Sequence, residues 1–221
     1  MNGPLLVIDA ATYRGTVAVV QGEHVVASAE TPMRGADAER LMPAVAAILN
    51  SAGLGLPDLS GIVCGAGPGS FTSLRIAASI AKGFAAATGI PLYQVSSLML
   101  IAAGAEPRLS AGRYLALLDA MRGDVFAARV SITDAGFAEA EGDVMLITAA
   151  AAARLSTDEG RERIGPDTER HCWPHARGVA RVDSRSGALV RAALESWEPS
   201  YGRLAEAQVK WELKHGRGLS T

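Results

Sequence analysis

The sequence predicts an α/β fold built from two similar lobes. Short apolar strands alternate with amphipathic helices along the 221 residues. A strand that ends in an aspartate, two further strands and a helix occur twice, and the two aspartates, Asp9 and Asp119, lie half the chain length apart. We therefore expect a first lobe over 1–107 and a second over 108–221, with the last helix or tail packing back toward the first lobe. Chance similarity between two unrelated hairpins is the alternative.

The composition narrows the classes of function. Apolar residues make up 49% of the chain, charged residues 20% and aromatic residues 5%, which predicts a globular protein with an aliphatic core. The net charge of −2 lacks the basic excess of proteins that bind nucleic acid on their own. Cys64 and Cys172, the two cysteines, provide neither a disulfide framework nor a closed zinc site.

The termini and apolar stretches predict a soluble, cytoplasmic protein with no membrane partner. Asp9 interrupts the first apolar run before the first basic residue, Arg14, which is the reverse of a signal peptide. The uncharged stretch 83–105 contains Gly89 and Pro91, which fit buried elements better than a membrane span.

Apolar patterning in the first half predicts five strands and three helices. The helix over 37–52 would have Asp37 as its cap, and Pro43 in its early turns predicts a kink or a later start. Gly53 and Gly89 suit the ends of the first two helices. The expected strands are 5–9, 16–21, 24–29, 62–64 and 92–95, and the other helices are 73–88 and one that begins at 96–97.

The second half restarts the pattern. We expect strands over 114–119, 124–130 and 143–147, followed by an alanine-rich helix that begins with residues 149–155. Arg122 and Gly123 follow Asp119 as Arg14 and Gly15 follow Asp9.

A glycine-rich loop, 65–70, joins a strand to the second helix. It matches neither the phosphate-binding P-loop nor the dinucleotide fingerprint. A structural turn and a ligand cradle are equally consistent with it. Ser70 or Thr72 would cap the helix. A cation is unfavourable in the first turn, so Arg75 there predicts a partner, either an acid in the fold or one across an interface.

Paired aspartates on two lobes are how actin-like kinases hold a metal nucleotide. Asp9 and Asp119 lack the nearby glycine that a phosphate would need, because Ala11 and Met121 stand there. We therefore favour a structural or degenerate role for both aspartates over a catalytic one.

Two other groups of residues could carry chemistry. His171 and His175 have the spacing of a metal pair, but Pro174 disfavours a helix between them, and exposed loop histidines are the preferred interpretation. The arginines over 161–191 alternate with acids, which predicts a solvated face or at best a weak tRNA-facing patch.

The run Gly67-Pro68-Gly69-Ser70-Phe71-Thr72-Ser73-Leu74-Arg75-Ile76, followed by Lys82-Gly83 and Val95-Ser96-Ser97-Leu98, resembles the TsaB (YeaZ) family of bacterial tRNA threonylcarbamoyladenosine biosynthesis proteins. Segments 6–12, 41–43 and 118–126 and the pattern Pro199-x-Tyr201-x-Arg203 are similar in the same order.

This resemblance implies an actin-like (ASKHA) fold and a subunit that is not itself catalytic. It would bind the catalytic paralogue TsaD and support, with TsaE, transfer of threonylcarbamoyl to the adenosine next to the anticodon. It would form a homodimer when alone, meet tRNA only through the complex and bind no cofactor alone, while the complex requires ATP and metal. The alternative functions are an actin-like small-molecule kinase or ATPase and a metallopeptidase. Nucleotide affinity of the isolated protein would indicate the kinase or ATPase, and a bound metal would indicate the metallopeptidase.

The resemblance also assigns residues. Ser73 and Ala77 replace glycines that are common in the family, and Asp37 replaces a histidine. The expected partner-binding residues on the two helices are Asp37, Leu41, Val45, Ser73, Ile76, Ala77, Ala78 and Ala81. The expected degenerate nucleotide cleft comprises Asp9, Gly67, Gly69, Ser70, Thr72 and Asp119.

Overall fold

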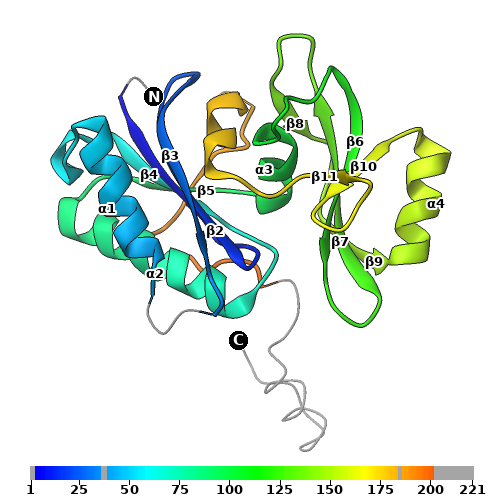
Figure 1. Cartoon of the computed structure of the whole chain (residues 1–221), viewed down its shortest axis with the longest axis horizontal. Helices are drawn as coiled ribbons and strands as arrows, with labels where there is room; N and C mark the ends of the chain where they lie inside the picture. The colour runs from blue at the N-terminus through cyan, green and yellow to red at the C-terminus, as the bar shows by residue number, and fades with distance from the viewer. Residues whose placement is uncertain (1–2, 36–38, 184–185, 202–221) are drawn as a thin grey trace, which may run out of the picture.

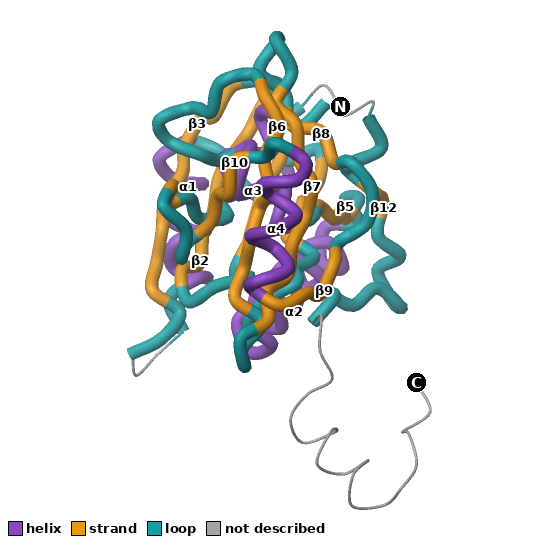
Figure 2. Tube along the Cα trace, turned by 90° about the vertical axis from the view of Figure 1, so that its right-hand side faces the viewer, coloured by secondary structure: helices purple, strands orange, loops and turns teal. Residues whose placement is uncertain are grey.

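The computed structural model describes residues 3–35, 39–183 and 186–201. Two β-sheets stand side by side, and a buried helix, α3, lies between them (Figure 1). Helices α1 and α2 cover the outer side of the first sheet, and α4 covers the outer side of the second (Figures 1 and 2). The molecule therefore has helices both outside and between its two sheets.

The first sheet has the strand order β12-β5-β4-β1-β2-β3. β1, β4 and β5 are parallel, whereas β1, β2 and β3 form an antiparallel meander. Every residue of β1 and β4 is buried because helices cover both faces of these strands. The strands are β1 (Leu5–Asp9), β2 (Arg14–Gln21), β3 (His24–Pro32), β4 (Gly61–Gly65), β5 (Leu92–Val95) and β12 (Val190–Arg191).

The two outer helices are α1 (Leu41–Ala52) and α2 (Phe71–Thr88). They end at Gly53 and Gly89, both in the left-handed conformation, as the sequence predicts. A short 3-10 turn, η1 (Leu56–Asp58), follows α1.

The start of α1 corrects the expected cap. The carboxylate of Glu39 accepts hydrogen bonds from the amides of Leu41 and Met42, so Glu39 supplies the first-turn acceptor, while Asp37 lies outside the described residues. Pro43 falls in the first turn, where a helix needs no amide donor, and the predicted later start is confirmed. α2 begins two residues earlier than expected.

Helix α3 (Ser97–Ala103) is buried along its whole length. It packs against β6 and β7 and against η2, a 3-10 helix over Ala176–Arg181. Its burial explains why the sequence around it carries no charge. No helix in the described ranges is long and apolar enough to cross a membrane.

The second sheet has the order β11-β10-β6-β7-β8, and β9 also pairs with β7. The antiparallel hairpin β6–β7 lies beside the parallel strand β10, as β1–β2 lies beside β4. The elements are β6 (Gly112–Asp119), β7 (Asp124–Ile132), β8 (Ala138–Ala140), β9 (Met145–Thr148), α4 (Ala149–Glu159), β10 (Glu162–Gly165) and β11 (Arg170–His171).

A segment from the second half returns to the first sheet. After η2, β12 pairs with β5, and Trp197 is buried against the cluster beneath α1 and α2. The indole of Trp197 donates to Gln94 Oε1 at 2.7 Å, and Lys82 Nζ donates to the Trp197 carbonyl at 3.0 Å. The expected boundary between 1–107 and 108–221 stays a prediction, and the last helix or tail falls in 202–221, outside the described residues.

Candidate functional site

Asp9, at the end of β1, is fully buried. Ser97 Oγ donates to its Oδ2 at 2.5 Å, and the Ala11 amide donates to its Oδ1 at 3.1 Å. Burial raises the pKa of Asp9, and these two hydrogen bonds oppose that effect. Ser97 Oγ also accepts from the Gly67 amide at 3.1 Å. The carboxylate therefore ties β1 to α3 and, through Ser97, to the glycine-rich loop.

The glycines of the loop allow close packing within this chain. A Cβ on Gly69 would lie 2.0 Å from the Ala11 carbonyl oxygen, which also accepts the Ser70 amide at 2.7 Å. Gly67 has a φ of 82°, and a Cβ there would lie 2.4 Å from the Ser200 carbonyl oxygen. The Ser200 amide in turn donates to the Ala66 carbonyl at 2.8 Å. Of the two interpretations left open by the sequence, this packing favours the structural turn.

The two matching aspartates have different surroundings. Asp119 is exposed at the end of β6, and its Oδ1 accepts from the Met121 amide at 2.8 Å. Met121 and Arg122 both have positive φ, at 64° and 60°. Ser70 occupies the N-cap position of α2 without a side-chain bond to the helix backbone, and Thr72 is exposed in the first turn. The degenerate cleft that joins these residues stays a prediction.

Most of the expected partner-binding side chains lie inside this chain's own core. These residues are between 0% and 5% exposed, because they form the inward stripes of α1 and α2, and their assignment to partner binding stays a prediction. Ile76 is half-buried, and Asp37 lies outside the described residues. The buried residues are Leu41, Val45, Ser73, Ala77, Ala78 and Ala81.

The exposed sides of the same helices are apolar, small and poor in charge. α1 contains no charged residue, and α2 contains only Arg75 and Lys82. Gly83, in the interior of α2, is exposed, and a Cβ on it would meet nothing within 4 Å. The exposed positions are Met42, Pro43, Ala46, Ala47, Asn50 and Ser51 on α1, and Phe71, Thr72, Arg75, Ser79, Gly83, Ala86 and Ala87 on α2.

Comparison with known proteins identifies the family. The model of the family "TsaD: tRNA N6-adenosine threonylcarbamoyltransferase" matches residues 34–165. The chain is 31% identical to the tRNA threonylcarbamoyladenosine biosynthesis protein TsaB of Escherichia coli, with 88% of this chain and 84% of that protein covered. The chain belongs to the TsaB family.

Two further relatives agree with this assignment. TsaB of Bacillus subtilis is 29% identical over 94% of this chain and 97% of that protein. The structure of YeaZ from Pseudomonas aeruginosa superposes with a TM-score of 0.71 and 25% identity, and the match covers 91% of this chain and all of that one. The two-lobed actin-like fold that the sequence predicts is confirmed.

In this TsaB family member, the two histidines have separate roles. His171 is exposed, and its Nδ1 lies 2.8 Å from the Pro166 carbonyl oxygen. His175 is 2% exposed, so the expectation of two exposed loop histidines is wrong for His175. Its Nδ1 accepts from the Arg177 amide at 3.1 Å, and its Nε2 lies 3.5 Å from Glu30 Oε1. The pair therefore belongs to two different hydrogen-bond networks.

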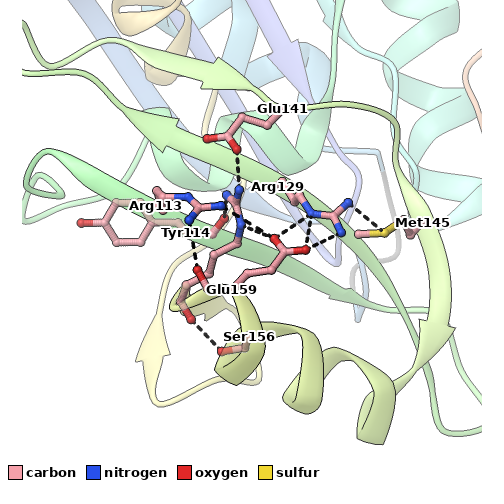
Figure 3. A network of polar contacts seen from close by, with 8 residues as sticks. Arg113, Tyr114, Arg129, Glu141, Met145, Ser156 and Glu159 are labelled. Atoms are coloured by element: carbon pink, nitrogen blue, oxygen red, sulfur yellow. Dashed lines mark hydrogen bonds and ion pairs between the residues drawn. The ribbon is translucent and has the colours of Figure 1, made fainter.

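The second lobe holds a network of paired charges (Figure 3). Arg129 makes a two-pronged contact with Glu159, in which its Nη2 lies 2.6 Å from Oε1. Arg161, whose side chain is 1% exposed, donates to Glu159 at 2.7 Å and to Glu141. The hydrogen bonds from Arg129 and Arg161 lower the pKa of Glu159 to about 2. These arginines join α4 to the second sheet and are not a free basic surface.

Two further residues, Arg75 and Ser97, have contacts that the sequence did not indicate. Arg75 has no ion pair with an acid among the described residues and instead lies 5.2 Å from the centre of the Phe71 ring. The sequence predicted that a helix begins at Ser96 or Ser97, but nothing in the local sequence indicated the hydrogen bond from Ser97 to Asp9, 88 positions away. Contacts of this kind depend on the tertiary fold.

Proposed function

We propose that this chain is a non-catalytic subunit in the synthesis of threonylcarbamoyladenosine in tRNA, which binds TsaD through α1 and α2 and acts together with TsaE. The named relatives in E. coli and B. subtilis are tRNA threonylcarbamoyladenosine biosynthesis proteins, and the matching family model carries the name of the transferase itself. We infer the role as a partner of that transferase from this family relationship and from the exposed faces of α1 and α2.

The surroundings of Asp9 support a role without catalysis by this chain. Both carboxylate oxygens accept hydrogen bonds from the chain itself, and Gly65 packs so closely that a Cβ there would lie 1.9 Å from Oδ2. The space beside the glycine-rich loop is filled by the backbones of Ala11 and Ser200. Both features that an actin-like kinase would use for a nucleotide are therefore engaged in internal packing, and we attribute the ATP and metal requirements to the complex.

The exposed glycine of α2 is the observation that carries the partner proposal. A glycine inside a helix destabilises the helix by about 1 kcal/mol relative to alanine. No close packing within the isolated chain requires a glycine at position 83, because a side chain there would point into open space. A helix of a partner could approach α2 closely at this position, beside the small exposed residues Ser79 and Ala87. We propose that the homodimer uses the same face when TsaD is absent.

The substitution Gly83→Leu tests this face without disturbing the core. We expect the variant to keep its circular dichroism spectrum and to have a thermal midpoint at least as high as that of the unmodified chain, since the new side chain meets nothing in the chain and leucine is a good helix former. Its affinity for TsaD of the same organism should fall at least about tenfold, because the added side chain separates the two surfaces. Size-exclusion chromatography with light scattering, on the chain alone and with TsaD, measures both the homodimer and the complex.

The matched control is Ala150→Leu, which adds similar bulk to the exposed start of α4 in the other lobe. This variant should bind TsaD as the unmodified chain does. Formation of a normal TsaD complex by Gly83→Leu would show that the exposed face of α2 is not the contact surface.

A further inference from the structure

Three chain segments meet at the edge of the first sheet where β1 and β4 end. The Met33 amide donates to the Tyr13 carbonyl at 2.8 Å, which places the segment after β3 beside the β1–β2 turn. The Ser70 amide donates to the Ala11 carbonyl at 2.7 Å, which places the start of α2 against the same turn. Residues distant in sequence therefore share one small surface.

This surface carries exposed aromatic rings. Tyr13 is 44% and Phe71 38% exposed, and they are the two aromatic residues among the large apolar side chains exposed in the described ranges. Tyr201 lies beside Phe71, with 4.5 Å between ring centres. In a chain with 5% aromatic residues, the gathering of its exposed rings at one edge indicates a surface that contacts something outside the chain.

Each of the two exposed rings has a guanidinium group beside it. Arg34 lies 3.1 Å from the centre of the Tyr13 ring, and Arg75 lies 5.2 Å from the centre of the Phe71 ring. Neither arginine forms an ion pair within the part of the chain that the structure describes. A guanidinium held against a ring keeps its in-plane N–H groups available for an anion.

Two acids near this edge, Glu30 and Glu198, already have cationic partners. Glu30 accepts from Arg14 at 2.7 Å, and Glu198 lies 3.8 Å from Lys82. Asp9 is buried beneath the surface and is bonded to Ser97. These acids therefore do not neutralise Arg34 or Arg75, which have no ion pair among the described residues.

We propose that the surface formed by Tyr13, Arg34, Phe71 and Arg75, the cation–aromatic edge, binds an unpaired segment of RNA. Bases stack on the two rings, and the guanidinium groups of Arg34 and Arg75 contact phosphates. An acidic peptide would use the arginines but would leave the rings without a comparable flat partner. The inference rests on the role in tRNA modification proposed above. The edge lies at the N-terminal end of α2, whereas the proposed TsaD contact is centred on Gly83 in the second half of that helix, so both can be used in one complex. With two phosphate contacts, the edge adds to the affinity of the complex and is weak alone.

Fluorescence anisotropy with a labelled RNA hairpin that carries an unpaired loop tests the proposal, with the corresponding fully paired duplex as the second probe. The titration is made with the full chain, alone and in complex with TsaD, over a range of salt concentrations. The double variant Arg34→Gln/Arg75→Gln should bind the hairpin about tenfold more weakly and lower the salt slope by about 1.4 units, about 0.7 for each phosphate contact removed. Tyr13→Ala and Phe71→Ala should weaken binding of the hairpin but not of the duplex, because only unpaired bases stack.

The control is Arg154→Gln, which removes one exposed positive charge from α4 in the other lobe. The proposal is overturned if the double variant binds the hairpin as this control does, if the unmodified chain binds no hairpin in either form, or if the double variant loses TsaD but not RNA. Gly83→Leu separates the two proposals, since it should lose TsaD while the chain alone keeps its affinity for the hairpin.

Discussion

At the scale of single residues, His175 shows how the fold changes the chemistry of a side chain. Burial lowers the pKa of His175 to about 4, and the positive charges of Arg177 and Arg14 act in the same direction. Glu30, 3.5 Å from Nε2, does not reverse these effects. The imidazole is therefore neutral in the folded chain at neutral pH, and its Nδ1 accepts the hydrogen bond that begins η2.

This neutral histidine predicts a pH dependence of stability. Because its folded-state pKa lies below the ordinary value of 6.5, the unfolded chain binds more protons between these two values. The stability contribution is present above pH 6.5 and is lost as the pH falls toward 4. The loss between pH 6.5 and about pH 5 is about 2 kcal/mol.

The substitution His175→Asn isolates this effect. An asparagine oxygen can replace Nδ1 as acceptor for the Arg177 amide but does not titrate. Urea unfolding at several pH values should show that the variant lacks the histidine-dependent part of the loss, whereas His24→Asn at the exposed start of β3 keeps it. Equal pH dependence in the unmodified chain and His175→Asn would contradict the assignment.

At the scale of elements, the sequence predicted the C-terminal ends of the helices α1 and α2 better than their N-terminal starts. Gly53 and Gly89 mark helix ends because the left-handed conformation needs a particular residue type, and this signal is local. The start of α1 depends on Glu39, and the sequence offers Asp37, two residues earlier, as a second acidic candidate for the cap. The short strands β8, β10, β11 and β12 were missed because two to four residues show no alternation and pair only where the tertiary fold brings a partner.

The two kinds of glycine in the α2 region give an element-scale prediction. Gly69→Ala places a methyl group 2.0 Å from the Ala11 carbonyl oxygen and should lower the free energy of unfolding by about 3 kcal/mol, because the loop must move from β1. Gly83→Ala makes the same chemical change in open space and should raise it by about 1 kcal/mol. Thermal or urea unfolding measures both, and similar effects at the two sites would contradict the packing described for the loop.

At the scale of the whole molecule, the repeat in the sequence predicted two lobes but not how they are joined. The repeat is visible because each strand–aspartate hairpin is local. The return of the chain to the first sheet is not visible, because it rests on single contacts such as the Ala176 amide with Thr16 Oγ1 at 3.0 Å, 160 positions apart. The same reason limited the prediction of the partner-binding residues. Ala78 and Ala81 are buried because their face of α2 packs against β4, which the local sequence does not specify.

The returning segment makes the two halves depend on each other, which Trp197→Ala tests. Trp197 is 8% exposed in the core of the first lobe, although it lies in the second half of the sequence, and it is hydrogen-bonded to Gln94 and Lys82. Removal of this side chain should cost about 3–5 kcal/mol of unfolding free energy. Because η2 lies between α3 and the first sheet, both lobes should lose stability together in one transition. Far-ultraviolet circular dichroism and hydrogen exchange at β6 and β7 monitor the second lobe directly, and an unchanged stability of β6 and β7 would show that the lobes unfold independently.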